Sequence, residues 1–139
     1  MPEAIKVSAT ISVGMKRLYE AWLDRMEHSA FTGGEALIDP IVGGRFTAWD
    51  GYIEGTTLEL KPNKRIVQSW RTSDFPKGAP DSKLEILFES AKTGTKMTFI
   101  HTEIPNGQGK NYKDGWKDFY FTPMKAYFKD EAKPKKKGK

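Results

Sequence analysis

His101 is the residue of this sequence that is best placed to do chemistry. It follows Met97 and Phe99 at intervals of two in the segment TKMTFIHTEI (95–104), so a strand there would carry the three side chains on one face. If that face points inward, the imidazole can hydrogen-bond a ligand or move a proton near neutral pH. The alternative, which we favour, is a core histidine satisfied by a neighbouring backbone group or a tyrosine hydroxyl. The second histidine, His28, lies among polar residues and is predicted to be on the surface.

The remaining residue types argue against most catalytic sites. Two histidines far apart in the sequence, with no cysteine, make a poor ligand set for a metal ion, so no metal site is predicted. The sequence contains no Gly-x-Ser-x-Gly nucleophile turn, no Gly-x-Gly-x-x-Gly and no phosphate-binding Walker loop. We therefore predict no cofactor and no catalytic residue. A hydrolase or cyclase that uses His101 is kept as an alternative to a binding function.

Aromatic side chains suggest a different kind of site, an apolar cavity for a small ligand. The sequence holds 8 Phe, 5 Tyr and 4 Trp, and each such side chain can bury about 150–250 Å². The predicted cavity lining comprises Phe46, Trp49, Trp70, Phe88, Phe99, His101, Trp116, Tyr120 and Met124. For each aromatic residue taken alone, ordinary core packing is the alternative.

Two arginines next to this set have two interpretations. Arg45 and Arg71 could pair with Asp or Glu on adjacent strands, or they could hold an anionic group of a ligand. We favour the ion pairs.

A sheet and a long helix have to position these residues. Residues 4–12 alternate apolar and polar side chains, which is typical of a half-buried strand. A helical pattern follows, and a short second helix is predicted from Met26 to Phe31, before Gly33 and Gly34. Further strands joined by short turns predict an antiparallel sheet. They cover residues 35–40, 44–50, 51–60, 65–72, 83–90 and 95–104.

The end of the chain switches to helical spacing over residues 111–131. Its broad apolar stripe comprises Trp116, Phe119, Tyr120, Met124, Tyr127 and Phe128. Pro123 falls inside this helix, where proline removes a backbone hydrogen bond and predicts a kink. The predicted order is β-α-α-β-β-β-β-β-β-α, an α+β domain in which a curved antiparallel sheet packs on a long C-terminal helix. A gap between the sheet and the helix would form the cavity.

Two segments carry a resemblance to a known family, GGRFTAWDGYIEGTTLELKPNKRIVQSWR (43–71) and GWKDFYFTPMKAYF (115–128). The first resembles a pattern of a Gly-Gly turn, a Phe strand, Asp-Gly, a Gly-centred strand, a Pro turn and a strand ending in Trp-Arg. The second resembles the Gly-Trp start of a closing helix. Together with His101, they are similar to the activator of heat-shock-protein-90 ATPase homologue family, of the START-like (SRPBCC, birch-allergen-like) superfamily. The resemblance covers the chain from about residue 4 to residue 131.

The resemblance implies a helix-grip fold and a choice of functions. Relatives in the superfamily bind lipids, hormones or polyketides, and some act as cyclases or hydrolases. The first hypothesis is therefore a module that binds a small hydrophobic or amphipathic ligand between the sheet and the helix. The alternative is docking on heat-shock-protein-90. In the eukaryotic co-chaperone a domain of this kind follows an N-terminal domain, for which we expect no room in this sequence.

The positive charge of the chain is concentrated at its end. The last seven residues hold five lysines, which equal the whole net charge of +5. Residues 1–132 are therefore predicted to form one nearly neutral helix-grip domain, and residues 133–139 a disordered lysine-rich tail. We expect a cytoplasmic protein with no membrane insertion and no nucleic-acid partner, either a monomer or a homodimer.

Overall fold

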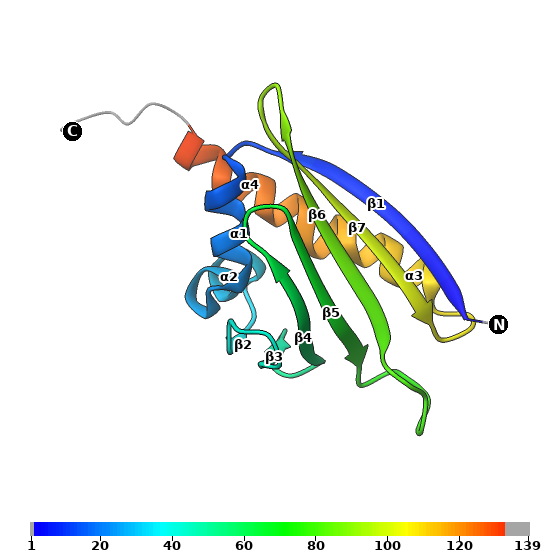
Figure 1. Ribbon diagram of the computed structural model, residues 1–139. Helices are drawn as coiled ribbons and strands as arrows, with labels where there is room; N and C mark the ends of the chain where they lie inside the picture. The colour runs from blue at the N-terminus through cyan, green and yellow to red at the C-terminus, as the bar shows by residue number, and fades with distance from the viewer. Residues whose placement is uncertain (1, 133–139) are drawn as a thin grey trace.

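A seven-stranded antiparallel sheet curves around one long helical run at the end of the chain (Figure 1). The computed structural model describes residues 2–132, with side chains from Pro2 to Lys129. The strands are β1 (Glu3–Ile11), β2 (Leu37–Ile38), β3 (Arg45–Ala48), β4 (Ile53–Lys61), β5 (Arg65–Thr72), β6 (Ser82–Ala91) and β7 (Gly94–Ile104). The helices are α1 (Met15–Leu23), α2 (Arg25–Thr32), α3 (Gly109–Gly115), the π-helix η1 (Trp116–Phe121) and α4 (Thr122–Ala132).

The order of these elements confirms the predicted α+β helix-grip fold. Each strand pairs with its neighbour in the order β1-β7-β6-β5-β4-β3-β2, and every pairing is antiparallel. The long helix lies across one face of the sheet, and α1 and α2 lie at one end of it, next to α4 (Figure 1). No helix in the described part of the chain is both long and apolar enough to cross a membrane. The predicted lysine-rich tail, residues 133–139, lies outside the described residues.

The strands β2 and β3 are shorter than the predicted strands 35–40 and 44–50, and a tight turn ends β3 at Ala48. Trp49, Asp50 and Gly51 have φ angles of 52°, 59° and 92°, all in the left-handed region. Glycine adopts this conformation freely, but a tryptophan there needs support from its surroundings. The support comes from the loop after α2. The Asp50 N–H donates to the Glu35 carbonyl at 3.0 Å, and the Asp50 carboxylate accepts from the Glu35 N–H at 2.9 Å.

Phe99 lies at the centre of the core, between the sheet and both sets of helices. Its ring contacts Trp22 of α1 at a centroid distance of 5.5 Å, and Trp116 and Phe121 of η1 at 4.6 and 4.9 Å. Aromatic pairs at such distances add stabilisation beyond the area that they bury. The strand alternation that predicted an inward face for Met97, Phe99 and His101 is confirmed, since all three side chains are buried.

The irregularity expected at Pro123 takes the form of the π-helix just before it. The Thr122 N–H bonds the carbonyl of Lys117, five residues back, instead of the usual four. The wider turn changes which side chains face inward. Phe121 is buried although it was not part of the predicted stripe, whereas Phe119, which was, is 59% exposed. The predicted stripe assumed a uniform α-helical period and therefore omitted Phe121, while Phe119 lies at the exposed edge of the stripe.

Gly55 of β4 is a position where the sheet has no room for a side chain. A Cβ atom built there would overlap the carbonyl oxygen of Ser69 and approach the ring of Phe46 to 2.7 Å. Gly55→Ala is therefore expected to destabilise the fold by about 1–3 kcal/mol or more, the cost of overpacking a core. The measurement is the free energy of unfolding in urea. Gly14→Ala is the control, because its Cβ would meet nothing within 4 Å. Equal effects of the two substitutions would contradict the close packing of β4 on β3 and β5.

Candidate functional site

A cavity of ≈ 420 Å³ lies between the sheet and the first half of the long helix. Its volume is above the roughly 300 Å³ at which small-molecule sites begin. The lining is Trp49, Tyr52, Ile53, Trp70, Asn111, Tyr112, Gly115, Trp116, Phe119 and Tyr120. None of these residues carries a charge, and the exposed ring of Phe119 marks where the cavity meets solvent.

The structure brings four of the nine predicted lining residues together at this cavity. They are Trp49 from the turn after β3, Trp70 from β5, and Trp116 and Tyr120 from η1. Trp49 meets Phe119 edge-to-face at 6.0 Å, and Trp70 lies 5.3 Å from Trp116. Aromatic rings from three elements that are distant in sequence thus face one space.

The other five predicted residues are not in the cavity wall. Phe88 packs on Tyr19 of α1 at 5.7 Å, and Phe99 and Met124 are enclosed in the core beneath the helix. Phe46 borders a smaller internal space, and His101 is buried behind Trp70 and Trp116. These residues point inward, as strand and helix periodicity indicated. The cavity occupies only part of the space between the sheet and the helices, and these residues lie outside that part.

Six lining residues were missed by the sequence analysis: Tyr52, Ile53, Asn111, Tyr112, Gly115 and Phe119. Phe119 was recognised as part of the helical stripe but was not assigned to the cavity. Tyr112 and Gly115 carry a usable signal, since they precede Trp116 and Phe119 by one helical turn on the same face. Tyr52 carries no such signal, because its place depends on the left-handed turn at Trp49.

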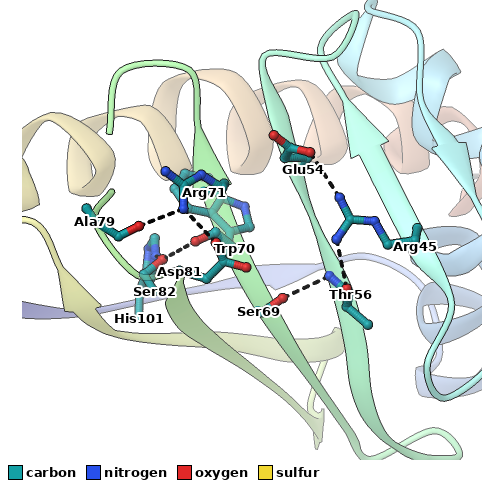
Figure 2. A network of polar contacts seen from close by, with 10 residues as sticks. All are labelled: Arg45, Glu54, Thr56, Ser69, Trp70, Arg71, Ala79, Asp81, Ser82 and His101. Carbon is teal, nitrogen blue, oxygen red and sulfur yellow. Dashed lines mark hydrogen bonds and ion pairs between the residues drawn. The ribbon is translucent and has the colours of Figure 1, made fainter. Parts of the chain in front are cut away.

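His101 is held by a chain of hydrogen bonds between the helix and the sheet. The indole N–H of Trp116 donates to Nδ1 of His101 at 3.1 Å, so the ring proton must be on Nε2. That Nε2–H donates to Oγ of Ser82 at 2.8 Å, and the Ser82 hydroxyl donates to the carbonyl of Trp70 at 2.6 Å (Figure 2). Burial lowers the pKa of His101 to about 3, so the ring is neutral.

This geometry is that of a structural histidine. A catalytic triad needs an acidic group that accepts from Nδ1, and an unprotonated Nε2 that takes the proton of the serine. Here Trp116 occupies the place of the acid and donates instead, so His101 presents a proton to Ser82 and cannot activate it. The favoured interpretation, a core histidine satisfied by its neighbours, is confirmed. The neighbours are Trp116 and Ser82, where a backbone group or a tyrosine was expected.

His28 was predicted on the surface, and that prediction is wrong. Its side chain is only 4% exposed, because α2 begins at Arg25 and turns position 28 toward the core. Nδ1 of His28 donates to the carbonyl of Trp22 at 2.9 Å, and Nε2 accepts from the hydroxyl of Tyr120 at 2.9 Å. Burial lowers the pKa of His28 to about 4 and raises the pKa of Tyr120, so the histidine is neutral and the tyrosine keeps its proton.

Two residues of the cavity wall therefore make their side-chain hydrogen bonds on the side that faces the core. Trp116 donates to His101 and Tyr120 donates to His28, both in the core. Each ring can then present apolar surface to the cavity without an unpaired N–H or O–H.

The opposite rim of the cavity is polar. The hydroxyl of Tyr112 donates to Oε1 of Gln108 at 2.7 Å and lies 2.7 Å from Oγ1 of Thr72. The hydroxyl of Tyr52 donates to the carboxylate of Asp74 at 2.5 Å. Burial, together with this carboxylate, raises the pKa of Tyr52 to about 12. Both tyrosines are thus fixed by their hydroxyls.

Arg45 and Arg71 form the ion pairs that were favoured for them (Figure 2). Arg45 pairs with Glu54 on β4 at 3.0 Å, and Arg71 pairs with Asp81, just before β6, at 2.8 Å. Neither arginine lines the cavity, so neither supplies a positive charge to a ligand there.

The comparison with known proteins places this architecture in a family. The profile of the family described as "Activator of Hsp90 ATPase homolog 1-like protein" matches residues 12–129. The chain belongs to this family. Among its relatives, the Dictyostelium discoideum "Activator of 90 kDa heat shock protein ATPase homolog" is 28% identical over 116 residues, 83% of this chain and 30% of that protein. The human homolog 1 is 27% identical over 124 residues, 89% of this chain and 36% of that protein.

A solved structure of an HSP90 activator has the same fold as this chain. The crystal structure of an HSP90 activator from Plasmodium falciparum superposes with a TM-score of 0.81 at 24% identity, over 91% of this chain and 96% of that one. At this identity the likeness shows the fold alone. The chain spans about a third of the length of the curated relatives that it matches.

The two buried neutral histidines predict a loss of stability in mild acid. An unfolded chain protonates histidine near pH 6.5, whereas the pKa values in the fold are about 3 and about 4. The unfolded state therefore binds more protons between pH 6.5 and 4. The free energy of unfolding should fall by about 1.4 kcal/mol per pH unit for each histidine as the pH drops through this window. Urea titrations at pH 7.5, 6.5, 5.5 and 4.5 measure this slope.

His28→Asn is the matched variant for this prediction, because its amide can still donate to the Trp22 carbonyl. It should be less stable at pH 7.5 but should show about half the slope. The carboxyl groups of Glu3 and Glu27 have lowered pKa values, so they add to the loss of stability as the pH approaches their ordinary value near 4.5, and the slope between pH 6.5 and 5.5 reports the histidines. A stability that stays constant from pH 6.5 to 5.5 would contradict the neutral, buried state of the histidines.

Proposed function

We propose that this chain is a binding module that holds a small, uncharged, largely apolar or aromatic ligand between the sheet and the long helix. The observation that carries the proposal is the cavity of ≈ 420 Å³ with its uncharged aromatic wall. The wall is firm, because Trp116, Tyr120, Tyr112 and Tyr52 are each fixed by a hydrogen bond at their polar atom. Pre-organised apolar sites lose little on binding, since few side chains have to be ordered.

Apolar burial would supply most of the affinity. Removing about 200 Å² of apolar ligand surface from water contributes roughly 5 kcal/mol before the cost of association. A charged ligand would lose its hydration against a wall with no charged partner, which disfavours it. The geometry gives no support to the hydrolase or cyclase alternative, because both nitrogens of His101 are engaged away from the cavity.

Gly115→Leu tests whether the cavity is the binding site. Gly115 lines the cavity, and a Cβ atom there would meet nothing closer than the Phe119 ring at 3.9 Å. Leucine can therefore fill the cavity from a helical position that favours it over glycine by up to about 1 kcal/mol. The neutral dye N-phenyl-1-naphthylamine, which fluoresces in apolar surroundings, should bind the unmodified protein saturably. The variant should bind it at least about tenfold more weakly, with an unchanged or higher melting temperature.

Lys113→Leu is the control for this experiment. It places the same side chain on an exposed position of the same helix. It should leave dye binding unchanged, because Lys113 does not line the cavity. Dye binding that survives Gly115→Leu at full strength would move the site elsewhere and refute the proposal.

Docking on Hsp90 is a second candidate, favoured by an exposed apolar surface at the β2–β3 edge together with the names of the relatives. Ile41 and Val42 are more than half exposed, and Leu58 of β4 is exposed as well. Hydrogen bonds between the backbone of Gly43 and Gly44 and that of Thr57 hold the loop of Ile41 and Val42 against β4. Matching proteins are named activators of the 90 kDa heat shock protein ATPase. Clustered apolar side chains at a sheet edge are typical of protein interfaces.

A double substitution, Ile41→Glu with Val42→Glu, tests this second candidate. If the edge docks on Hsp90, the double variant should bind purified Hsp90 about tenfold or more weakly in calorimetry, because two carboxylates would be buried in the interface. Met26→Glu is the control, since Met26 is an exposed apolar residue on α2. Absence of binding by the unmodified chain, or equal binding by the double variant, would reject docking through this edge.

A further inference from the structure

A second, much smaller internal space lies behind the aromatic cavity. Its volume is ≈ 10 Å³, about enough for one water-sized group. Ile53, Trp70 and Tyr120 line both spaces, so the two spaces adjoin at these three side chains. A ligand seated in the cavity can therefore place one small polar group at the smaller space.

Gln68 of β5 lines the smaller space and brings an unsatisfied polar atom to it. The side chain is only 2% exposed. Its Nε2 donates to Oγ1 of Thr57 at 3.2 Å, while Oε1 has no hydrogen-bond partner among the described residues. A buried acceptor without a partner is costly, and native proteins seldom keep one without a reason.

The histidine and the tyrosine at this space do not supply the missing donor. His28 and Tyr120 border the same space, but Nδ1 of His28 donates to the Trp22 carbonyl and the Tyr120 hydroxyl donates to Nε2. No charged side chain lines either space. The free group is thus a single neutral acceptor, which attracts a donor. It would repel a carboxylate, because two oxygen atoms with lone pairs would face each other.

We propose that the ligand carries one neutral hydrogen-bond donor, a hydroxyl or an aromatic amino group, and that Oε1 of Gln68 accepts it. The body of the ligand is aromatic or alicyclic and packs against Trp49, Trp70 and Trp116. This inference rests on the proposed binding function and specifies the ligand class for the same cavity. Gln68 is then a specificity-determining residue, because its amide selects the head group while the tryptophans bind any apolar body of suitable size.

Three probes of one shape test the inference by equilibrium dialysis at pH 7. They are 2-naphthol, with a hydroxyl donor, naphthalene, with none, and 2-naphthoate, with an anionic acceptor. One hydrogen bond to a previously unsatisfied acceptor should make 2-naphthol bind about tenfold tighter than naphthalene. The anionic 2-naphthoate should bind at least about tenfold more weakly than 2-naphthol.

Two variants assign the preference to Gln68. Gln68→Met keeps the length of the side chain and removes the acceptor, so naphthalene should bind as before while the preference for 2-naphthol disappears. Thr57→Val removes the hydrogen bond on the other side of the amide and leaves Oε1 in place, so the preference should remain. Unchanged naphthalene binding also shows that each variant is folded.

The outcomes separate this inference from the proposal on which it rests. Equal affinity for 2-naphthol and naphthalene in the unmodified protein overturns the inference but leaves the binding function standing. A preference for 2-naphthol that survives Gln68→Met overturns it as well. Failure of both neutral probes to bind the unmodified protein removes the binding function and the inference together.

Discussion

The structure depends on a buried hydrogen-bond chain that joins the closing helix to the sheet. The indole of Trp116 donates to His101, His101 donates to Ser82, and Ser82 donates to the backbone of Trp70. Each group is buried, and each donor finds one acceptor, so the chain costs little despite the loss of hydration. It ties the helix to the sheet, because the indole N–H of Trp116 on the helix bonds Nδ1 of His101 on β7. The neutral state of His101 is a condition for this arrangement, since a protonated ring would have no acceptor for the indole.

The π-helix decides which aromatic side chains the helix turns toward the cavity and which toward the core. Pro123 has no backbone N–H, and the preceding turn is wound to a five-residue spacing. Phe121 consequently enters the core, and Phe119 moves outward to the mouth of the cavity. Trp116 and Tyr120 remain at the wall with their polar atoms directed to the two histidines. Irregular turns of this type often accompany binding sites, because they place side chains where a regular helix cannot.

Family and function are separate conclusions for this chain. The match over residues 12–129 and the shared fold make it a member of the Hsp90-activator family. The relatives are about three times as long, so their whole activity is not carried over with the fold. The cavity adds a property of this chain itself, a pre-formed apolar space that adjoins the buried, unpartnered Oε1 of Gln68 in the described part of the chain. The proposed ligand cavity and the proposed docking edge are different surfaces, so the two proposals do not exclude each other.

The sequence by itself determined the fold class, the element order and the inward face of most strands. Periodicity was sufficient there, because alternation along β1 and β7 directly reports which side chains face the core. It also favoured ion pairs for Arg45 and Arg71 over contacts with a ligand, and the structure shows these pairs with Glu54 and Asp81. Tertiary structure alone decided the cavity. Periodicity assigns a residue to a face but not to a position along it, so Phe88 and Trp70 look alike in sequence, although only Trp70 borders the empty space. The buried His28 bonds Tyr120, 92 residues away, and no local pattern in the sequence carries a hydrogen bond of that range.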